Sequence, residues 1–156
     1  IINGITLKNS LKNLDLPVVL YSALKIENVS NSYNIEEAKK LFEKNNILIF
    51  VAGTGNPFFT TDTTAVIRGL EMDCDIILKA TKVDGIYNKD PYKYNDAIKF
   101  DKLTYRDVLE KKLAVMDMTA ISLADENMLP ILVFSIKKKN ELNKVLHGNG
   151  SFTIVS

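Results

Sequence analysis

One stretch of this sequence combines glycines with hydroxyl and amide side chains, the residue types that commonly bind phosphate. It reads Val51-Ala52-Gly53-Thr54-Gly55-Asn56-Pro57-Phe58-Phe59-Thr60-Thr61-Asp62. Glycines at positions 53 and 55 allow the backbone to turn sharply and to approach a ligand without Cβ clashes. A helix expected to begin near Thr61 would add free N–H groups and a positive dipole end. The stretch is therefore typical of a site for phosphate or another anion.

The same stretch has a less specific interpretation. It matches neither the Walker loop nor the dinucleotide fingerprint, because Gly-Lys-Ser/Thr is missing and Phe58 replaces the third glycine. A plain strand-to-helix turn, with Asp62 as an ordinary acid of the first helical turn, stays open on these grounds. The adjacent aromatic residues Phe58 and Phe59 favour a binding site, since a base can pack against them.

A second polar cluster spans residues 79–91 and contains the strong turn signal Asp84-Gly85. Two of its lysines, Lys79 and Lys82, are candidate phosphate partners, although a lysine-rich turn is also typical of a solvated loop. A polar pocket with an aromatic edge would need three residues of the cluster: Thr81, Tyr87 and Asp90.

Five short apolar runs alternate with helical patterns and must position these two clusters. The runs cover residues 18–21, 47–51, 76–78, 131–134 and 152–155. Such runs are typical of strands buried on both faces of a parallel sheet. The helical patterns cover residues 2–14, 34–44, 61–72, 104–112, 117–128 and 139–147. The alternation predicts an α/β fold with a mostly parallel sheet flanked by helices, where ligands bind beyond the carboxyl ends of strands.

Local signals mark the ends of several predicted helices. Asn34 and Glu37 have the spacing of a capping box, and Thr104 is a candidate N-cap. Gly148 is expected just past a helix end, at the C′ position. His147 precedes it, where a basic residue favours the helix dipole, and we expect no catalytic role for it.

Composition and charge limit the classes of function. With 156 residues, 46% hydrophobic and 25% charged, the chain is typical of an ordered globular domain. The net charge of +1 gives no sign of a nucleic-acid binder, and the lysines at 137–139 are expected to form a solvated helix start. No apolar run reaches the roughly 18 residues of a membrane span, so we expect no membrane partner.

The single cysteine, Cys74, cannot form an internal disulfide, which is consistent with a reducing compartment and predicts a cytoplasmic protein. Aspartates flank it and no histidine is near, so we expect Cys74 to be a packing residue. No cluster of His, Cys and carboxylate residues has the spacing of metal ligands, and no structural metal site is expected.

The two polar clusters, together with Val115-Met116-Asp117, resemble the bacterial-type uridylate kinases of the amino acid kinase superfamily. Further support comes from residues 68–69, 103–105, 129–131 and 150–155. The resemblance extends over essentially the whole chain. Members of this family are longer at the N-terminus and carry a Lys-Leu-Ser-Gly phosphate loop on their first strand. We therefore expect residues 1–156 to be the C-terminal portion of a single amino acid kinase-like domain, inactive by itself.

The resemblance implies transfer of the ATP γ-phosphoryl group to UMP, giving UDP, with Mg²⁺ arriving on the phosphates of ATP. It implies a UMP site formed by Thr54, Gly55, Asn56, Pro57, Phe58, Phe59, Thr60 and Thr61, and an ATP site that uses Thr81, Tyr87 and Asp90. Asp62 and Asp117 are the implied catalytic acids. Asp62 would hold the cations that stabilise the transferring group, because phosphoryl transfer depends mainly on positioning and charge. Met116-Asp117 is the uridylate kinase form, which distinguishes the chain from relatives that phosphorylate carboxylates or carbamates.

The family also implies a homohexamer that GTP activates and UTP inhibits, with no nucleic-acid partner. Two alternatives stay open. One is a non-catalytic module that binds or stores nucleotides on the same fold, and the other is a different kinase of the superfamily.

Overall fold

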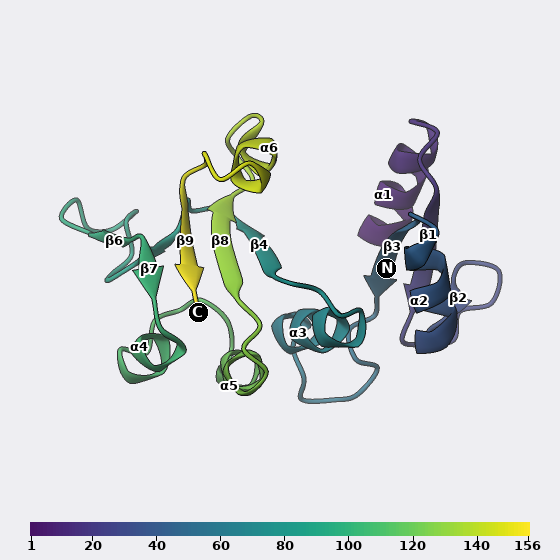
Figure 1. Cartoon of the computed structure of the whole chain (residues 1–156), viewed down its shortest axis with the longest axis horizontal. Helices are drawn as coiled ribbons and strands as arrows, with labels where there is room; N and C mark the ends of the chain where they lie inside the picture. Colours follow the sequence, from purple (N-terminus) through teal and green to yellow (C-terminus); the bar gives the residue numbers. More distant parts are fainter. The chain divides into compact units, whose positions relative to one another are not determined.

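Helices and strands alternate along the chain in the computed structural model, which describes residues 1–156 (Figure 1). The predicted α/β class is therefore confirmed. The chain divides into two compact units, residues 1–64 and residues 65–156. That the chain is the C-terminal portion of a single larger domain stays a prediction.

The first unit is a small parallel sheet with two helices. Its strands lie in the order β2-β1-β3, and both neighbouring pairs are parallel. The elements are α1 (Ile2–Lys12), β1 (Val18–Ser22), β2 (Asn31–Ser32), α2 (Ile35–Glu43) and β3 (Ile47–Val51). The side chains of Val18, Leu20 and Ile49 form the core, and Ile5 and Leu11 of α1 pack against it.

The second unit contains a four-stranded sheet in the order β4-β8-β9-β7 and a short antiparallel ribbon of β5 and β6. Its strands are β4 (Ile77–Thr81), β5 (Ile86–Tyr87), β6 (Lys99–Phe100), β7 (Lys102–Leu103), β8 (Ile131–Ser135) and β9 (Phe152–Val155). Strand β4 runs parallel to β8, and β7 runs parallel to β9, whereas β8 and β9 are antiparallel. The prediction of mostly parallel pairing is confirmed.

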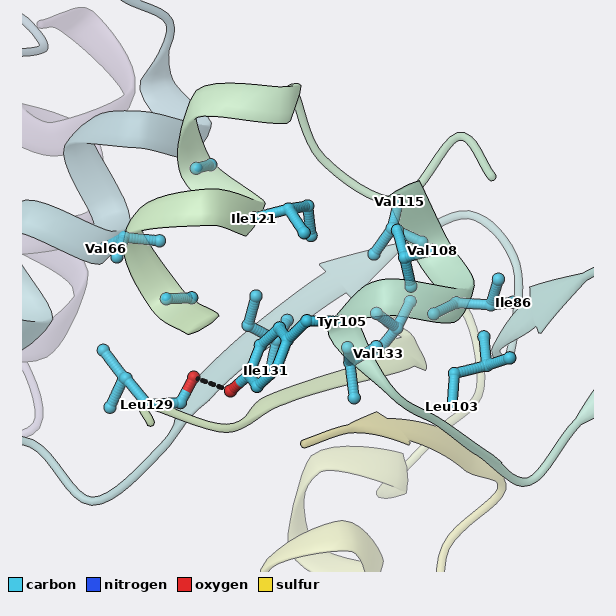
Figure 2. Close-up of a cluster of buried hydrophobic side chains, with 13 residues drawn as sticks. Val66, Ile86, Leu103, Tyr105, Val108, Val115, Ile121, Leu129, Ile131 and Val133 are labelled. Atoms are coloured by element: carbon cyan, nitrogen blue, oxygen red, sulfur yellow. Dashed lines mark hydrogen bonds between the residues drawn. The ribbon is translucent and has the colours of Figure 1, made fainter. Parts of the chain in front are cut away.

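Four helices complete the secondary structure: α3 (Thr61–Glu71), α4 (Tyr105–Glu110), α5 (Met118–Glu126) and α6 (Glu141–Leu146). The main core of the second unit consists of Val66, Ile86, Leu103, Tyr105, Val108, Val115, Ala120, Ile121, Ala124, Leu129, Ile131, Val133 and Val155. Figure 2 shows the hydroxyl of Tyr105 directed at the carbonyl of Leu129, to which it donates a 2.6 Å hydrogen bond. This bond satisfies the one polar group that the tyrosine brings into the core.

The predicted burial of the strands is only partly right. Strand β8 is buried at every position, as a central strand covered on both faces should be. Strands β3 and β4 are only partly buried, because each lies at the edge of its sheet and pairs with a single neighbour. The two-residue strands were not predicted, since runs that short carry no periodic pattern.

The predicted helix ends are largely confirmed. The Asn34 side chain accepts a 2.9 Å hydrogen bond from the backbone N–H of Glu37 and caps α2. Thr104 caps α4, where Asp107 completes a full capping box that the sequence prediction did not include. Gly148 follows α6 with a φ of 73°, the left-handed conformation typical of the C′ position. None of the helices is long and apolar enough to cross a membrane.

Two expectations for single residues need correction. Cys74 is exposed, so the prediction of a packing residue is wrong; it lies just past α3, where the chain turns on the surface. The lysines at 137–139 are exposed as predicted, but α6 begins only at Glu141 and Lys138 forms an ion pair.

Candidate functional site

The loop at residues 52–60 follows β3 at its carboxyl end and leads into α3. Four of its residues have left-handed backbone: Ala52 (φ 67°), Gly53 (φ 63°), Gly55 (φ 78°) and Phe58 (φ 68°). Two of these residues carry a Cβ atom, for which this conformation is unfavourable. Backbone held in such a conformation is concentrated at ligand sites and switch regions.

Local hydrogen bonds hold this loop in its bent form. The Thr54 hydroxyl accepts a 3.0 Å bond from the backbone N–H of Asn56 and lies 3.3 Å from the Asn56 carbonyl oxygen, to which it donates. The N–H of Gly55 donates to the carbonyl of Ala52 at 3.3 Å. Each of these bonds joins residues two or three positions apart, so the loop is organised from within itself.

Thr60 caps the helix that follows, and the predicted start of that helix at Thr61 is confirmed. The Thr60 hydroxyl accepts bonds from the N–H groups of Asp62, at 3.1 Å, and Thr63, at 3.3 Å. The Thr64 hydroxyl donates to the Thr60 carbonyl at 2.8 Å. The cap uses two of the N–H groups that the sequence prediction left for an anion, and leaves the dipole end of the helix in place.

The two aromatic residues of the loop are exposed. Phe58 has a relative exposure of 104%, so its ring contacts almost nothing in this unit, and Phe59 has a value of 51%. A fully exposed phenylalanine on a strained backbone position contributes nothing to a core. It is available to stack on a flat, partly apolar ligand such as a base.

A pocket of about 590 Å³ lies in the second unit, beyond the carboxyl end of β4. Its walls come from the end of β4, from the segment that follows it through Pro91, from residues 111–115 after α4, and from Val133 of β8. The three residues of the second cluster that the sequence singled out, Thr81, Tyr87 and Asp90, all line it. The volume falls within the range of small-molecule sites.

The pocket lining is strongly basic. Asp90 is its one acid. Its four lysines are Lys79, Lys89, Lys111 and Lys112. Lys89 pairs with Asp96 at 2.5 Å and Lys111 pairs with Asp107 at 2.6 Å.

Lys112 forms no ion pair within 4 Å and has a left-handed φ of 50°. Lys82 is exposed and does not line the pocket. A surplus of positive charge in a concave site attracts anionic ligands.

Two of the predicted pocket residues shape the chain at the rim. The Thr81 hydroxyl donates to the Val83 carbonyl at 2.7 Å and accepts from the Val83 N–H at 3.0 Å. An Asp90 carboxylate oxygen accepts from the N–H of Tyr92 at 2.9 Å, and Lys93 lies 3.7 Å from the other oxygen. Both side chains therefore stabilise turns at the entrance of the pocket.

Tyr87, the third predicted residue, belongs to a network centred on Asp84. The Tyr87 hydroxyl donates to Asp84 Oδ1 at 2.7 Å. Asp84 Oδ2 accepts from Lys138 Nζ at 2.9 Å and from the Ser151 hydroxyl at 3.1 Å. Sequence reasoning missed this network because Lys138 and Ser151 are 54 and 67 residues away from Asp84. No local sequence pattern indicates a pairing over such a separation.

Hydrogen bonding in this network shifts the acidities of its members. Burial by itself would raise the pKa of Asp84, but the three side-chain donors outweigh it and hold that pKa well below the usual carboxyl range. The hydrogen bond to Asp84, with some burial, raises the pKa of Tyr87 to about 12. The Asp84 carboxylate likewise raises the pKa of Lys138. Asp84 is therefore ionised at neutral pH, and Tyr87 is a neutral donor.

Gly85 lets the turn after β4 lie directly on β9. A Cβ atom at this position would come within 2.5 Å of Thr153 Oγ1 and 2.9 Å of Lys99 Cδ. The Thr153 hydroxyl accepts a 2.8 Å bond from the Ile86 N–H and donates to the carbonyl of Phe100. The backbone beside Tyr87 is thus fixed by contacts that do not involve Asp84.

The two predicted catalytic acids have different local settings. Asp62 lies in the first turn of α3, within the first unit. Asp117 lies in the second unit and caps α5, where its carboxylate accepts a 2.9 Å bond from the N–H of Ala120. A capping role is therefore established for Asp117. No group of three or more His, Cys, Asp or Glu residues is placed to hold a metal ion.

Comparisons with known proteins agree on one relationship. Residues 1–135 match the family described as the amino acid kinase family. The uridylate kinase of Buchnera aphidicola subsp. Schizaphis graminum is 44% identical over 155 residues, which cover 99% of this chain and 65% of the relative. That of Psychrobacter cryohalolentis is 47% identical, with coverages of 99% and 64%.

Solved structures are similar over the same region. The UMP kinase from Ureaplasma parvum superposes with a TM-score of 0.95 at 40% identity, covering 99% of this chain and 66% of that one. The UMP kinase from Bacillus anthracis gives a TM-score of 0.94 at 31% identity, with coverages of 99% and 64%. The chain thus spans about 65% of the length of the first curated relative.

Proposed function

Because the chain belongs to the amino acid kinase family, we propose that it takes part in transfer of the ATP γ-phosphoryl group to UMP. The products are UDP and ADP. The observation that carries the proposal is the basic pocket beyond β4, which brings Thr81, Tyr87 and Asp90 together. The similarity to uridylate kinases over nearly the whole chain supports the choice of UMP as acceptor.

The pocket of the second unit has the chemistry expected for ATP. Its lysines supply the positive charge that a triphosphate needs, and Lys112 has no competing carboxylate partner. The ring of Tyr87 offers an apolar wall for a base. Thr81 and Asp90 shape the entrance through their turn hydrogen bonds, so in this proposal they position backbone groups around the nucleotide.

The loop of the first unit has the chemistry expected for UMP. Phe58 and Phe59 are exposed for contact with a base. The α3 N-terminus, where Thr60 and Thr61 lie, offers its positive dipole end to the monophosphate. Thr54, Gly55, Asn56 and Pro57 complete the proposed UMP site as the turn that presents these groups.

The reaction requires the bond between the γ-phosphorus and the β,γ-bridging oxygen to break as a UMP phosphate oxygen bonds to that phosphorus. The bridging oxygen leaves with its electron pair on ADP. Asp62 would act by holding a cation near the transferring group, since a carboxylate cannot itself neutralise phosphate charge. Mg²⁺ belongs to the substrate MgATP in this proposal, which is consistent with the lack of an acidic cluster that could hold a resident ion. For Asp117 we propose a part in the phosphoryl transfer in addition to its capping bond.

The resemblance to the family extends the proposal to assembly and regulation. It supports a homohexameric, cytoplasmic enzyme of pyrimidine nucleotide synthesis that GTP activates and UTP inhibits. The single exposed cysteine is consistent with a reducing compartment. Sedimentation analysis, together with rate measurements at increasing GTP or UTP, tests these statements separately.

A coupled assay of the native protein, purified at its natural length, tests the central proposal. With UMP, ATP and Mg²⁺ we expect steady formation of UDP, and a slower rate when CMP replaces UMP. Binding of both nucleotides without turnover would instead identify a storage module. A preference for CMP or for an amino-acid acceptor would identify a different kinase of the family.

A further inference from the structure

We infer that Asp84 is a positioning residue that fixes the ring of Tyr87 as a wall of the adenine-nucleotide pocket. This inference rests on the proposed function of that pocket. Tyr87 lines the pocket, whereas Asp84 does not. The bond of 2.7 Å between the Tyr87 hydroxyl and Asp84 Oδ1 therefore joins the wall to a support behind it.

Both oxygens of the Asp84 carboxylate are engaged, and the donors come from separate parts of the second unit. Tyr87 belongs to β5, and Lys138 lies in the segment between β8 and α6. Ser151 directly precedes β9. A carboxylate held by three donors cannot turn, and so it fixes the direction from which it accepts the tyrosine hydroxyl.

Ser151, which donates to the Asp84 carboxylate, is itself bonded to a buried acid, Glu141. The backbone N–H of Ser151 donates to Glu141 Oε1 at 2.7 Å, and Glu141 at the start of α6 is only 4% exposed. The Ser151 hydroxyl also accepts a 2.8 Å bond from Lys99 Nζ. These bonds connect Asp84 to α6 and to the β6 strand, so the position of the carboxylate is determined by the body of the unit.

The backbone next to Tyr87 does not depend on Asp84. Ile86 is held by its bond to the Thr153 hydroxyl, and Gly85 packs closely against the same threonine. Loss of the Asp84 carboxylate would leave this backbone in place and release only the tyrosine side chain. Lys138 loses little, because its side chain is 51% exposed and water can solvate it. The expected defect is therefore mainly one of binding, with a smaller loss of stability, because the depressed pKa of Asp84 means that its carboxylate also stabilises the folded state at neutral pH.

Calorimetric titration of the native protein with MgATP and, separately, with UMP tests the inference. In Asp84→Asn we expect MgATP to bind about tenfold more weakly, the size of a hydrogen bond to a charged group. UMP affinity should stay close to the wild-type value, and the thermal unfolding midpoint should fall by only about 2–4 °C, the shift that the loss of one hydrogen bond produces in a protein of this size. Tyr87→Phe should show the same selective loss, and the double variant should lose no more than either single one.

Two further variants serve as matched controls. Lys138→Met removes one charged donor but keeps the Tyr87 bond to Oδ1, so its effect on MgATP affinity should be smaller. Arg106→Ala removes an exposed ion pair with Glu110 elsewhere in the same unit and should change neither affinity.

A second readout follows the tyrosine directly. The difference in tyrosinate absorbance between wild type and Tyr87→Phe reports the ionisation of Tyr87, and Asp84→Asn should move that ionisation to lower pH.

Wild-type MgATP affinity in Asp84→Asn, or an equal loss of both affinities together with the unfolding midpoint, would overturn the inference. If the wild type binds UMP but no MgATP, the proposed function of the pocket fails. An unchanged Tyr87 titration in Asp84→Asn would separately overturn the positioning role.

Discussion

The loop of the first unit and the pocket of the second hold their functional side chains by opposite means. In the loop, the hydroxyl groups of Thr54 and Thr60 and the Thr60 carbonyl bond residues no more than four positions away, and the ring of Phe58 is fully exposed. In the pocket, Tyr87 is held through Asp84 by residues more than 50 positions further along the chain.

This difference separates two ways of building a ligand site. The loop is stabilised by its own turns, so a change there alters binding while the sheet behind it stays intact. The pocket is part of the packing of its unit, so changes near it affect both stability and binding. A small set of substitutions tests this contrast.

The largest effect is expected for Asp62→Asn in the loop region. Turnover of the native protein should fall about 100-fold or more, since under the proposed function the Asp62 carboxylate holds the cations around the transferring phosphoryl group. The free energy of unfolding should fall by less than about 1 kcal/mol, the usual contribution of a first-turn acid. Rate measurements and chemical denaturation check the two values.

Glu36→Gln is the matched control for Asp62→Asn, because Glu36 is also a first-turn acid, on α2 of the same unit. It should leave turnover unchanged. Equal losses of turnover and stability in Asp62→Asn would mark Asp62 as a structural acid and would remove the contrast.

The second effect compares a glycine from each region. Gly85→Ala should destabilise the protein by about 2–3 kcal/mol, because the new methyl group overlaps the Thr153 hydroxyl and the Lys99 side chain. Gly53→Ala should cost only about 1 kcal/mol, since its nearest new contact is Thr64 Oγ1 at 3.6 Å and only the left-handed backbone opposes the change. Thermal melts of both variants measure the difference, and equal destabilisation would contradict it.

The third effect concerns the internal bonds of the loop. Thr54→Val removes the hydroxyl that bonds Asn56 and should weaken UMP binding about tenfold, with little change in the unfolding midpoint. Thr54→Ser keeps the hydroxyl and should restore most of the affinity. Unchanged UMP affinity in the valine variant would exclude Thr54 from the site.

The smallest effect concerns Lys112 at the pocket. Lys112→Gly removes an unpaired positive charge and should weaken MgATP binding about threefold, in line with one partly solvated charge. Stability should be unchanged or rise by about 1 kcal/mol, because glycine adopts the φ of 50° without strain. Met128→Gly, at an exposed left-handed position after α5, relieves the same strain and should leave MgATP affinity unchanged.

Much of the fold can be predicted from the sequence because its main elements are encoded locally. The run at 131–134 is continuous, apolar and rich in β-branched residues, and it lies within the fully buried β8. Helix α2 begins where Asn34 and Glu37 predict, because a side-chain cap acts over three residues. The inference from continuous apolar runs predicts too much burial for β3 and β4. Both are edge strands, and whether a strand lies at the edge or the centre of its sheet is not encoded in its own residues.

The pocket could be predicted only in part. Residues 79–91 alone favour a solvated loop over a pocket, and it is the resemblance to the kinase family that selects Thr81, Tyr87 and Asp90. The pairing of Asp84 with Lys138 could not be predicted, because it depends on the parallel pairing of β4 with β8. Cys74 is a different case, since the flanking Asp73 and Asp75 are of a type that is rarely buried and so indicate an exposed turn.

The strand order of the two sheets also has a consequence for how the protein folds. The pairings of β1 with β2 and β3 can all form once Val51 has left the ribosome, because β3 is the last of these three strands in the sequence. In the second unit, β7 pairs only with β9, which ends at Val155, so about 50 residues must be synthesised before β7 finds its partner. Closing that long loop is slow, and until then β7 and one edge of β8 expose unpaired backbone groups. The second unit is therefore expected to fold after the first and to be the part that most needs protection from aggregation during synthesis.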